Sequence, residues 1–349
     1  MNTKRIRDYG IVIGTHPTGP RNKITDVPGV RVGHCTVVDD RHRTGVTVIL
    51  PAPGNLYARR LIATAHVING FGKTAGTIQL RELGLLETPI ALTNTLNVGK
   101  VADGVVGYTL EQCLKENVTC WTVNAVVGET NDWVMNDVSD RCLDERHVRA
   151  AIEAACEDFD EGDVGAGKGT SCFGLKGGIG SASRQLRFGD KVYTVGALVQ
   201  SNFGSTADLL IDGRPVGERI CRRLEGERIA VEDKGSIMIV LGTDLPLSEL
   251  QLGRIARRAE VGLVRTGSHI GHQSGDVVLA FTTANRQVQD GQVMHAMEIL
   301  DDSCMEPAFY AVGEAVEEAI LNSLSASDRV VGYSGVVMRS LNEFLPDCL

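Results

Sequence analysis

Residues 229–243 read IAVEDKGSIMIVLGT and place one serine between a charged run and a strongly apolar segment. Residues 237–241 are apolar throughout, which is typical of a strand that is buried on both faces of its sheet. The charged residues 232–234 precede Gly235 and Ser236. The stretch therefore predicts that a solvated loop enters a buried strand at Ser236, and a sheet of such strands must be covered by other layers.

Outside this stretch, strand and helix patterns follow one another without the strict strand–helix–strand repeat of a doubly wound fold. Ser248 begins a helix with the capping box Ser248-x-x-Gln251, and its apolar stripe continues to Leu263. We therefore predict sheets that are covered by helices in a layered α/β arrangement. The predicted strands are 30–32, 45–50, 122–127, 192–199, 237–242 and 276–283, and the other predicted helices are 98–116, 147–156 and a helix-rich stretch over 293–324.

Composition and charge exclude several classes of protein. The chain has 349 residues, 43% of them hydrophobic and 23% charged, which is typical of one or two globular domains. A net charge of −9 argues against a nucleic-acid binder, which needs a basic surface. We expect no membrane span, because no apolar run reaches the length of one, and no signal peptide. Nine scattered cysteines without a CxxC pair predict a reduced, cytoplasmic protein.

Two motifs suggest ligand sites only weakly. Residues 162–170 nearly match a phosphate-binding loop, but Gly169 replaces the expected Ser or Thr, and acidic residues precede the loop in place of a strand. We predict a tight glycine loop near another site. His269 and His272 with Asp276 have the types of side chain that bind metals, but a glycine-rich loop does not fix their geometry. We expect no metal and no cofactor.

Ser236 has both an ordinary and a chemical explanation. A glycine and a serine are common where a turn leads into a strand. However, cleavage of the Gly235–Ser236 bond would give Ser236 a free α-amine with a reference pKa of about 7.7–8.0, able to act as a base on its own hydroxyl. The same choice applies to Ser274 and Asp276, which are common turn residues, and to Asn202 at a strand end. The local sequence leaves both explanations open.

Over almost its whole length the chain resembles the family of L-aminopeptidase/D-esterases and β-peptidyl aminopeptidases, which are self-processing hydrolases. The motifs that carry the resemblance are KITDVPGVRVGHCT (23–36), TNTLNVGKVADG (93–104), the GET…ND stretch (128–137), GAGKGTSCFGLKGGIGSASR (165–184), YTVGALVQSNFG (193–204), DKGSIMIVLGTDLPL (233–247) and RTG…SGDVVLAFTTANR (265–286). The resemblance implies a four-layer α/β/β/α sandwich similar to N-terminal-nucleophile hydrolases, with its own connectivity.

The resemblance also implies one self-cleavage, between Gly235 and Ser236. It would divide a single α/β domain, residues 1–349, into associated fragments 1–235 and 236–349. The charged run at 232–234 would then be an accessible linker that moves away after the cut. Such enzymes assemble as homo-oligomers.

Site roles follow by the same resemblance. Ser236 matches the nucleophile, and Ser274 and Asp276 match the serine and the carboxylate that help to activate it. Asn202 matches an amide of the oxyanion hole, and Glu129 matches the acidic residue that holds the free amine of the substrate. Asn131, which we count with Glu129 among the substrate-binding residues, stands where an aromatic residue such as tyrosine is expected. Either its amide donates in place of the tyrosine hydroxyl, or the specificity has changed.

The expected function is release of an N-terminal residue from a peptide, amide or ester through an acyl-enzyme on Ser236. One alternative is a self-processing acyltransferase like ornithine acetyltransferase, although such enzymes usually present threonine. Another is an uncut, non-catalytic binding protein. The preference for α- or β-residues, and for L or D, does not follow from the sequence.

Overall fold

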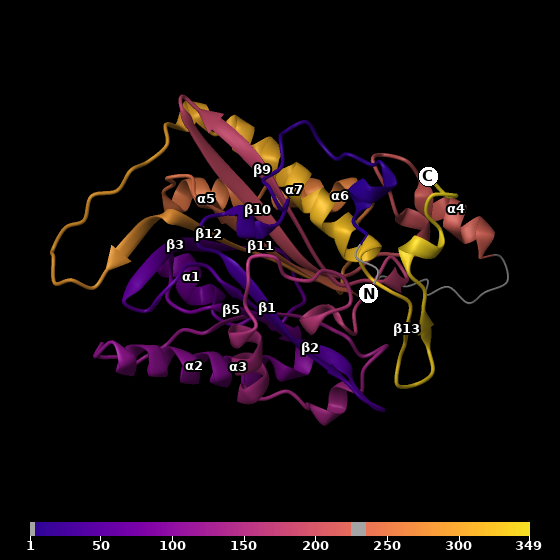
Figure 1. The fold of residues 1–349 in the computed structure, drawn as a ribbon, viewed down its shortest axis with the longest axis horizontal. Coiled ribbons are helices and arrows are strands. Elements are labelled where there is room, and N and C mark those ends of the chain that lie inside the picture. The colour runs from indigo at the N-terminus through magenta and orange to yellow at the C-terminus, as the bar shows by residue number, and fades with distance from the viewer. Residues whose placement is uncertain (1–3, 225–234) are drawn as a thin grey trace.

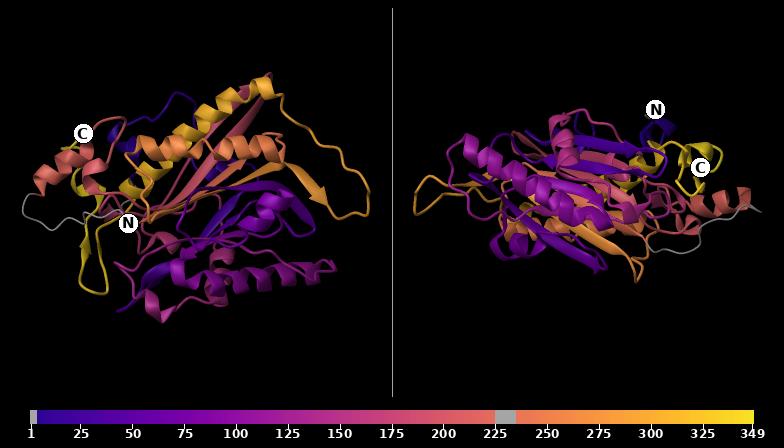
Figure 2. Two further views of the ribbon diagram at one scale, coloured as in Figure 1. Left: turned by 180° about the vertical axis from the view of Figure 1, so that it is seen from behind. Right: turned by 90° about the horizontal axis from the view of Figure 1, so that it is seen from below.

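A computed structural model describes residues 4–224 and 235–349, and these form four layers (Figure 1). Helices α2 (Val98–Lys115) and α3 (Glu145–Glu153) make one outer layer, and α5 (Glu249–Ala256), α6 (Ala259–Arg265) and α7 (Glu306–Ser325) make the other. Two sheets lie between them, as the view from behind also shows (Figure 2). The predicted α/β/β/α sandwich is confirmed. The charged run at 232–234 lies outside the described residues.

The smaller sheet has four strands in the order β1-β2-β5-β6. Strands β1, β2 and β5 pair antiparallel, and β5 pairs with β6 in parallel. Val48, Ala91 and Val127 pack with Val101 and Val148 of helices α2 and α3. The strands are β1 (Arg31–Val38), β2 (Arg43–Leu50), β5 (Ile90–Asn94) and β6 (Val126–Thr130).

The larger sheet has six strands in the order β4-β3-β12-β11-β10-β9. Strand β11 pairs with β12 in parallel and with β10 antiparallel. Met238, Leu198 and Leu279 point into the core that the two sheets share, whereas Ile237 and Ile239 belong to the core under α5–α7. The strands are β3 (Arg59–Gly70), β4 (Leu85–Leu86), β9 (Ile179–Phe188), β10 (Lys191–Asn202), β11 (Ser236–Thr243) and β12 (Gly275–Val288).

Shorter elements connect these layers. Helix α1 follows β3, and α4 precedes residue 225. Two small hairpins, β7–β8 and β13–β14, complete the described structure. Their bounds are α1 (Thr77–Leu83), α4 (Val216–Arg223), β7 (Ser171–Cys172), β8 (Leu175–Lys176), β13 (Val330–Val331) and β14 (Val337–Met338).

Several predicted elements have different bounds in the structure. The helix that Ser248 caps, with its side chain accepting from Gln251, ends at Ala256, and a second helix follows it. That second helix packs closely on α7, because a Cβ at Gly262 would lie 2.6 Å from the Gly313 carbonyl oxygen. The helix predicted over 293–324 begins only at Glu306.

The reason for that later start is local. Pro307 lies in the first turn of α7, where its missing backbone donor costs nothing. The segment before it protrudes from the sandwich between β12 and α7 (Figures 1 and 2), with Val293 and Met294 almost fully exposed. The strand predicted over 122–127 begins at Val126.

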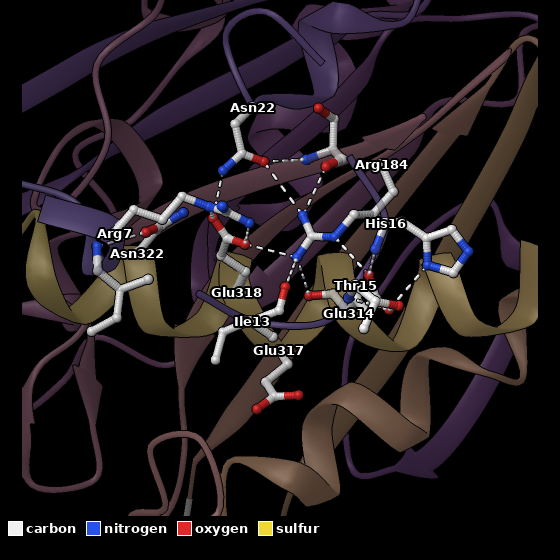
Figure 3. A network of polar contacts seen from close by, with 12 residues as sticks. Arg7, Ile13, Thr15, His16, Asn22, Arg184, Glu314, Glu317, Glu318 and Asn322 are labelled. Atoms are coloured by element: carbon white, nitrogen blue, oxygen red, sulfur yellow. Dashed lines mark hydrogen bonds and ion pairs between the residues drawn. The ribbon is translucent and has the colours of Figure 1, made fainter. Parts of the chain in front are cut away.

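A buried network of charges joins α7 to β9 and to the N-terminal segment (Figure 3). Arg184 is fully buried, and its guanidinium lies 2.9 Å from Glu314 and 2.7 Å from Glu318. Arg7 forms a second, two-bonded pair with Glu318 at 2.6 and 2.8 Å. Both carboxylates are almost inaccessible to water. Their ionised forms are therefore stabilised by these cationic partners and not by hydration.

Backbone and amide groups complete the network. The Arg184 guanidinium also donates to the Ile13 carbonyl oxygen at 2.8 Å, and Asn22 Nδ2 donates to Glu318 Oε1 at 2.5 Å. Burial by itself would raise the pKa of Glu318, but the hydrogen bond from Arg7 and the charge of Arg184 outweigh it and hold that pKa below its usual value. The carboxylate is therefore ionised in the folded protein.

We expect Arg184→Met to destabilise the protein by about 3–5 kcal/mol, because it leaves two buried carboxylates without their shared cation. Urea unfolding followed by circular dichroism measures the change. The matched control is Arg222→Met, which removes an exposed pair with Glu218 and should change the free energy of unfolding by no more than about 1 kcal/mol. Equal effects of the two substitutions would contradict the importance of the buried network.

Candidate active site

Ser236 is the first residue of the central strand β11, where the neighbouring strands also have an end. It pairs with Asn202, the last residue of β10, and with Gly275, the first residue of β12. The Gly275 N–H donates a hydrogen bond to Ser236 Oγ at 3.1 Å. The hydroxyl is thus held at a point where three strand ends meet, and Ser236 is only 6% exposed.

Ser274 and Asp276 flank Gly275 at the same end of the sheet. Ser274 Oγ donates to Asp276 Oδ1 at 2.5 Å, and the Ile237 N–H donates to the same oxygen at 3.2 Å. Both side chains are buried. The Ser274–Asp276 pair therefore lies against the backbone directly after Ser236, at the amide of Ile237.

Asn202 is oriented by the glycine-rich loop. Its Oδ1 accepts a hydrogen bond from the Ser171 N–H at 2.9 Å, which fixes the direction of the Nδ2 amide. Residues 162–170 lead directly to Ser171, so the loop lies beside the predicted site, as the sequence suggested. Lys168 pairs with Asp163 at 2.5 Å, and only a short 3-10 turn, Gly165–Gly167, replaces the helix that a phosphate-binding loop requires.

A buried lysine fixes the shape of this loop. Lys176 Nζ donates to the carbonyl oxygens of Gly167, Thr170 and Gly177 at 2.8, 2.8 and 2.5 Å. The side chain is fully buried, and this burial lowers the pKa of Lys176 to about 7. Lys176 was not among the residues predicted for the site, although it lies within the motif 165–184 that carried the resemblance.

Glu129 lies near the end of β6, and its carboxylate accepts hydrogen bonds from two groups of the protein. Its Oε1 accepts from the Lys73 N–H at 2.9 Å, and its Oε2 accepts from Thr95 Oγ1. A carboxylate has about four acceptor positions, so these two bonds leave capacity for a further donor. Thr95, a partner that the sequence reasoning missed, holds the carboxylate in one orientation.

The segment 69–75 connects Glu129 with the serine strands. Asn69 Nδ2 donates to the Ser274 carbonyl oxygen at 2.5 Å, and the Phe71 N–H donates to the same oxygen at 3.3 Å. Farther along, Ala75 exchanges two backbone hydrogen bonds with Val127 of β6. The segment therefore spans from the large sheet to the small one and brings Glu129 to the end of β12.

Asn131 does not take the role of an aromatic side chain. Its Oδ1 accepts from the Trp133 N–H at 3.1 Å, so the side chain closes a local turn. The neighbouring Asp132 is buried and accepts from the amides of Asn94 and Asn136 at 3.2 and 3.1 Å. Burial raises the pKa of Asp132 to about 6.

We find no metal-binding cluster of side chains in the parts of the chain that the structure describes. Residues 4–224 and 235–349 contain no group of three or more His, Cys, Asp or Glu side chains arranged to hold an ion. His269 is largely exposed and lies 3.6 Å from Asp208, whereas Asp276 is buried and accepts from Ser274. Over the same described residues, no helix is both long and apolar enough to cross a membrane.

Comparison with known proteins shows the fold and the family of this chain. The fold is that of the N-terminal-nucleophile hydrolases, in the variant described for the L-aminopeptidase D-Ala-esterase/amidase of Ochrobactrum anthropi. That structure is 33% identical, has a TM-score of 0.90 and covers 99% of this chain and 98% of its own. The model of peptidase family S58 matches residues 22–338. The chain belongs to peptidase family S58, and it is a hydrolase of the aminopeptidase type.

Other relatives match over nearly the full length. Beta-peptidyl aminopeptidase BapA of Sphingosinicella microcystinivorans is 37% identical, over 97% of this chain and 89% of its own length. A beta-aminopeptidase structure from Burkholderia sp. is 40% identical with a TM-score of 0.91, covering 99% of this chain and 98% of its own. A protein from Pyrococcus horikoshii OT3 is 46% identical with the same TM-score, covering 97% and 96%.

We expect Lys176→Met to destabilise the protein, because each buried carbonyl left without a donor costs about 1–3 kcal/mol. Urea unfolding measures the loss, and Lys191→Met at the exposed start of β10 is the control.

The effect should depend on pH. An unfolded lysine has a pKa near 10.4. Between pH ~7 and ~10.4 the unfolded chain therefore binds more protons than the folded protein. Over this interval the free energy of unfolding of the wild type rises with pH. The difference in the free energy of unfolding between wild type and Lys176→Met should increase across this interval. A constant difference would contradict a buried lysine with a lowered pKa.

Proposed function

We propose that this protein is a self-processing serine aminopeptidase that releases N-terminal residues from peptides, amides or esters through an acyl-enzyme on Ser236. The observation that carries the proposal is the position of Ser236 at the head of β11, with its hydroxyl held by Gly275 and with the Glu129 carboxylate brought to the same end of the sheet. Release of the residue requires no metal in this scheme.

In the proposed self-cleavage, Ser236 Oγ attacks the carbonyl carbon of Gly235. The carbon–oxygen bond forms, the peptide carbon–nitrogen bond breaks, and the nitrogen takes up the hydroxyl proton and leaves as the α-amine of Ser236. Water then hydrolyses the ester and releases the Gly235 carboxylate. The products are the fragments 1–235 and 236–349.

The packing around Gly235 supports this position for the cut. A Cβ at Gly235 would lie 1.7 Å from the Asn202 carbonyl oxygen and 2.6 Å from the Phe203 Cα. A residue with a side chain would therefore push the scissile bond away from Asn202. Contact with β10 therefore gives a packing reason for glycine at this position.

In the proposed turnover, the freed α-amine of Ser236 is the base that takes the proton of its own hydroxyl. The Ser274–Asp276 pair, which binds the N–H of the adjacent residue Ile237, would orient the amine. The Asn202 amide, oriented by Ser171, would donate to the oxyanion. Glu129 would bind the ammonium group of the substrate, which restricts cleavage to unblocked N-termini.

We also propose that the cleaved units form a homo-oligomer in the cytoplasm. The protruding segment before α7 exposes Val293, Met294 and Ile299, which is unusual unless another surface covers them. No disulfide joins any of the nine cysteines, all of which lie in described residues, as expected in a reducing compartment.

We expect purified wild-type protein to show two masses that correspond to 1–235 and 236–349, and Ser236→Ala to remain one inactive chain of 349 residues. Intact-mass spectrometry and release of p-nitroaniline from a panel of α- and β-aminoacyl p-nitroanilides measure both steps. Ser139→Ala, an exposed serine, is the control and should behave as wild type.

Substitutions of Ser274 and Asp276 are expected to reduce the rates in the same experiment without abolishing them. Ser274→Ala and Asp276→Asn should slow both cleavage and turnover. Full activity of either variant would contradict the assigned site. A wild-type chain that stays whole after long incubation would support an uncut binding protein, and acyl transfer to an added amine acceptor in preference to water would support an acyltransferase.

Glu129→Gln should raise KM for substrates with a free amine by roughly 10–100-fold, because a hydrogen bond to a charged group contributes about 1.5–3 kcal/mol. Self-cleavage should persist, since the scissile bond presents no free amine. Glu153→Gln, at the exposed end of α3, is the matched control. If N-acetylated substrates were cleaved by wild type as fast as free ones, Glu129 would not have the proposed role.

A further inference from the structure

Gly72 lies at the point where the segment 69–75 passes between the two proposed functional groups. It is exposed to solvent and does not have a positive φ, so no backbone requirement explains a glycine here. Its neighbour Lys73 donates its N–H to Glu129 Oε1. The Gly72 backbone also packs against Gly275. A Cβ on Gly275 would lie only 3.0 Å from the Gly72 Cα.

A side chain on Gly72 would point between Glu129 and Gly275. A Cβ on Gly72 would point to a place 3.5 Å from Glu129 Oε1 and 3.6 Å from the Gly275 Cα, with Thr74 Oγ1 next at 4.0 Å. Gly275 in turn holds Ser236 Oγ through its N–H at 3.1 Å. The place that a side chain would fill therefore lies between the carboxylate and the strand end that positions the nucleophile.

A substrate must cross the same place. Its ammonium group has to reach Glu129 while its carbonyl carbon reaches Ser236 Oγ, so the carbon atoms between these two groups lie over the gap beside Gly72. Any atom added to Gly72 competes with the substrate for this volume. A glycine leaves room for a substituted or longer N-terminal residue.

We propose that Gly72 is a specificity-determining residue that forms the wall of the pocket for the N-terminal residue of the substrate and limits the size of that residue. This inference rests on the proposed aminopeptidase function and adds the position at which substrate size is selected. A Cβ at Gly72 has only ordinary van der Waals neighbours, so the folded protein accommodates alanine without strain.

Self-cleavage gives an independent readout. Its acyl residue, Gly235, packs closely against Asn202 and Phe203 at the end of β10. A substitution at Gly72 should therefore change substrate selection and leave the self-cleavage rate as it is.

The test compares Gly72→Ala and Gly72→Val with wild type on small and large members of two p-nitroanilide series, glycyl against L-leucyl and β-alanyl against β-homoleucyl. In the series that wild type cleaves, Gly72→Ala should lower kcat/KM for the large residue relative to the small one by about tenfold or more, mainly through KM. Gly72→Val should lower it further. Intact mass follows self-cleavage in each variant.

Gly70→Ala is the matched control, because its Cβ would meet only Val67, at 3.7 Å, and it should keep the wild-type ratio. An unchanged ratio in Gly72→Ala, an equal loss on both substrates, or a loss of self-cleavage would overturn the proposal. If Gly72→Val does not fold, as judged by circular dichroism, the alanine variant decides. Absence of cleavage of every substrate by wild type would instead contradict the proposed function, independently of Gly72.

Discussion

The pairing of β11 with both of its neighbours holds the centre of the large sheet together and positions Ser236. Strand β11 begins at Ser236, and its first residue is already in register with Asn202 of β10 and Gly275 of β12. Since the strand is buried on both faces, its backbone hydrogen bonds and its apolar side chains fix the serine without help from the chain before it. A cut before Ser236 would remove no strand from the sheet.

The same pairing explains how two fragments would stay together. Residues 236–349 supply the central strands β11 and β12 and the helices α5–α7, whereas β3, β4, β9 and β10 come from the first fragment. The buried charges of Arg184, Glu314 and Glu318 join β9 to α7 across the same division. Separation would expose both the sheet and uncompensated charges, and each costs free energy.

Much of this organisation could be predicted from local patterns. The apolar run after Ser236, the capping box at Ser248 and the helix over 98–116 all have their expected form, because burial and caps act within a few residues. Predictions failed where distant parts of the chain decide the outcome. The helix that Ser248 caps ends at Ala256, and the next helix packs on α7 at Gly262. The apolar side chains of Val293 and Met294 stay exposed and do not support a helix.

By itself, the sequence determined the layered α/β class, the entry of a loop into a buried strand at Ser236 and, through resemblance, the residues expected at the site. Only the tertiary structure decided which atoms meet. It placed Gly275 N–H on the Ser236 hydroxyl, Lys73 and Thr95 on Glu129, and Gly72 in the gap between them. The physical reason is that these contacts join residues far apart in the chain, and their distances depend on how two sheets pack, which no local pattern of side chains encodes.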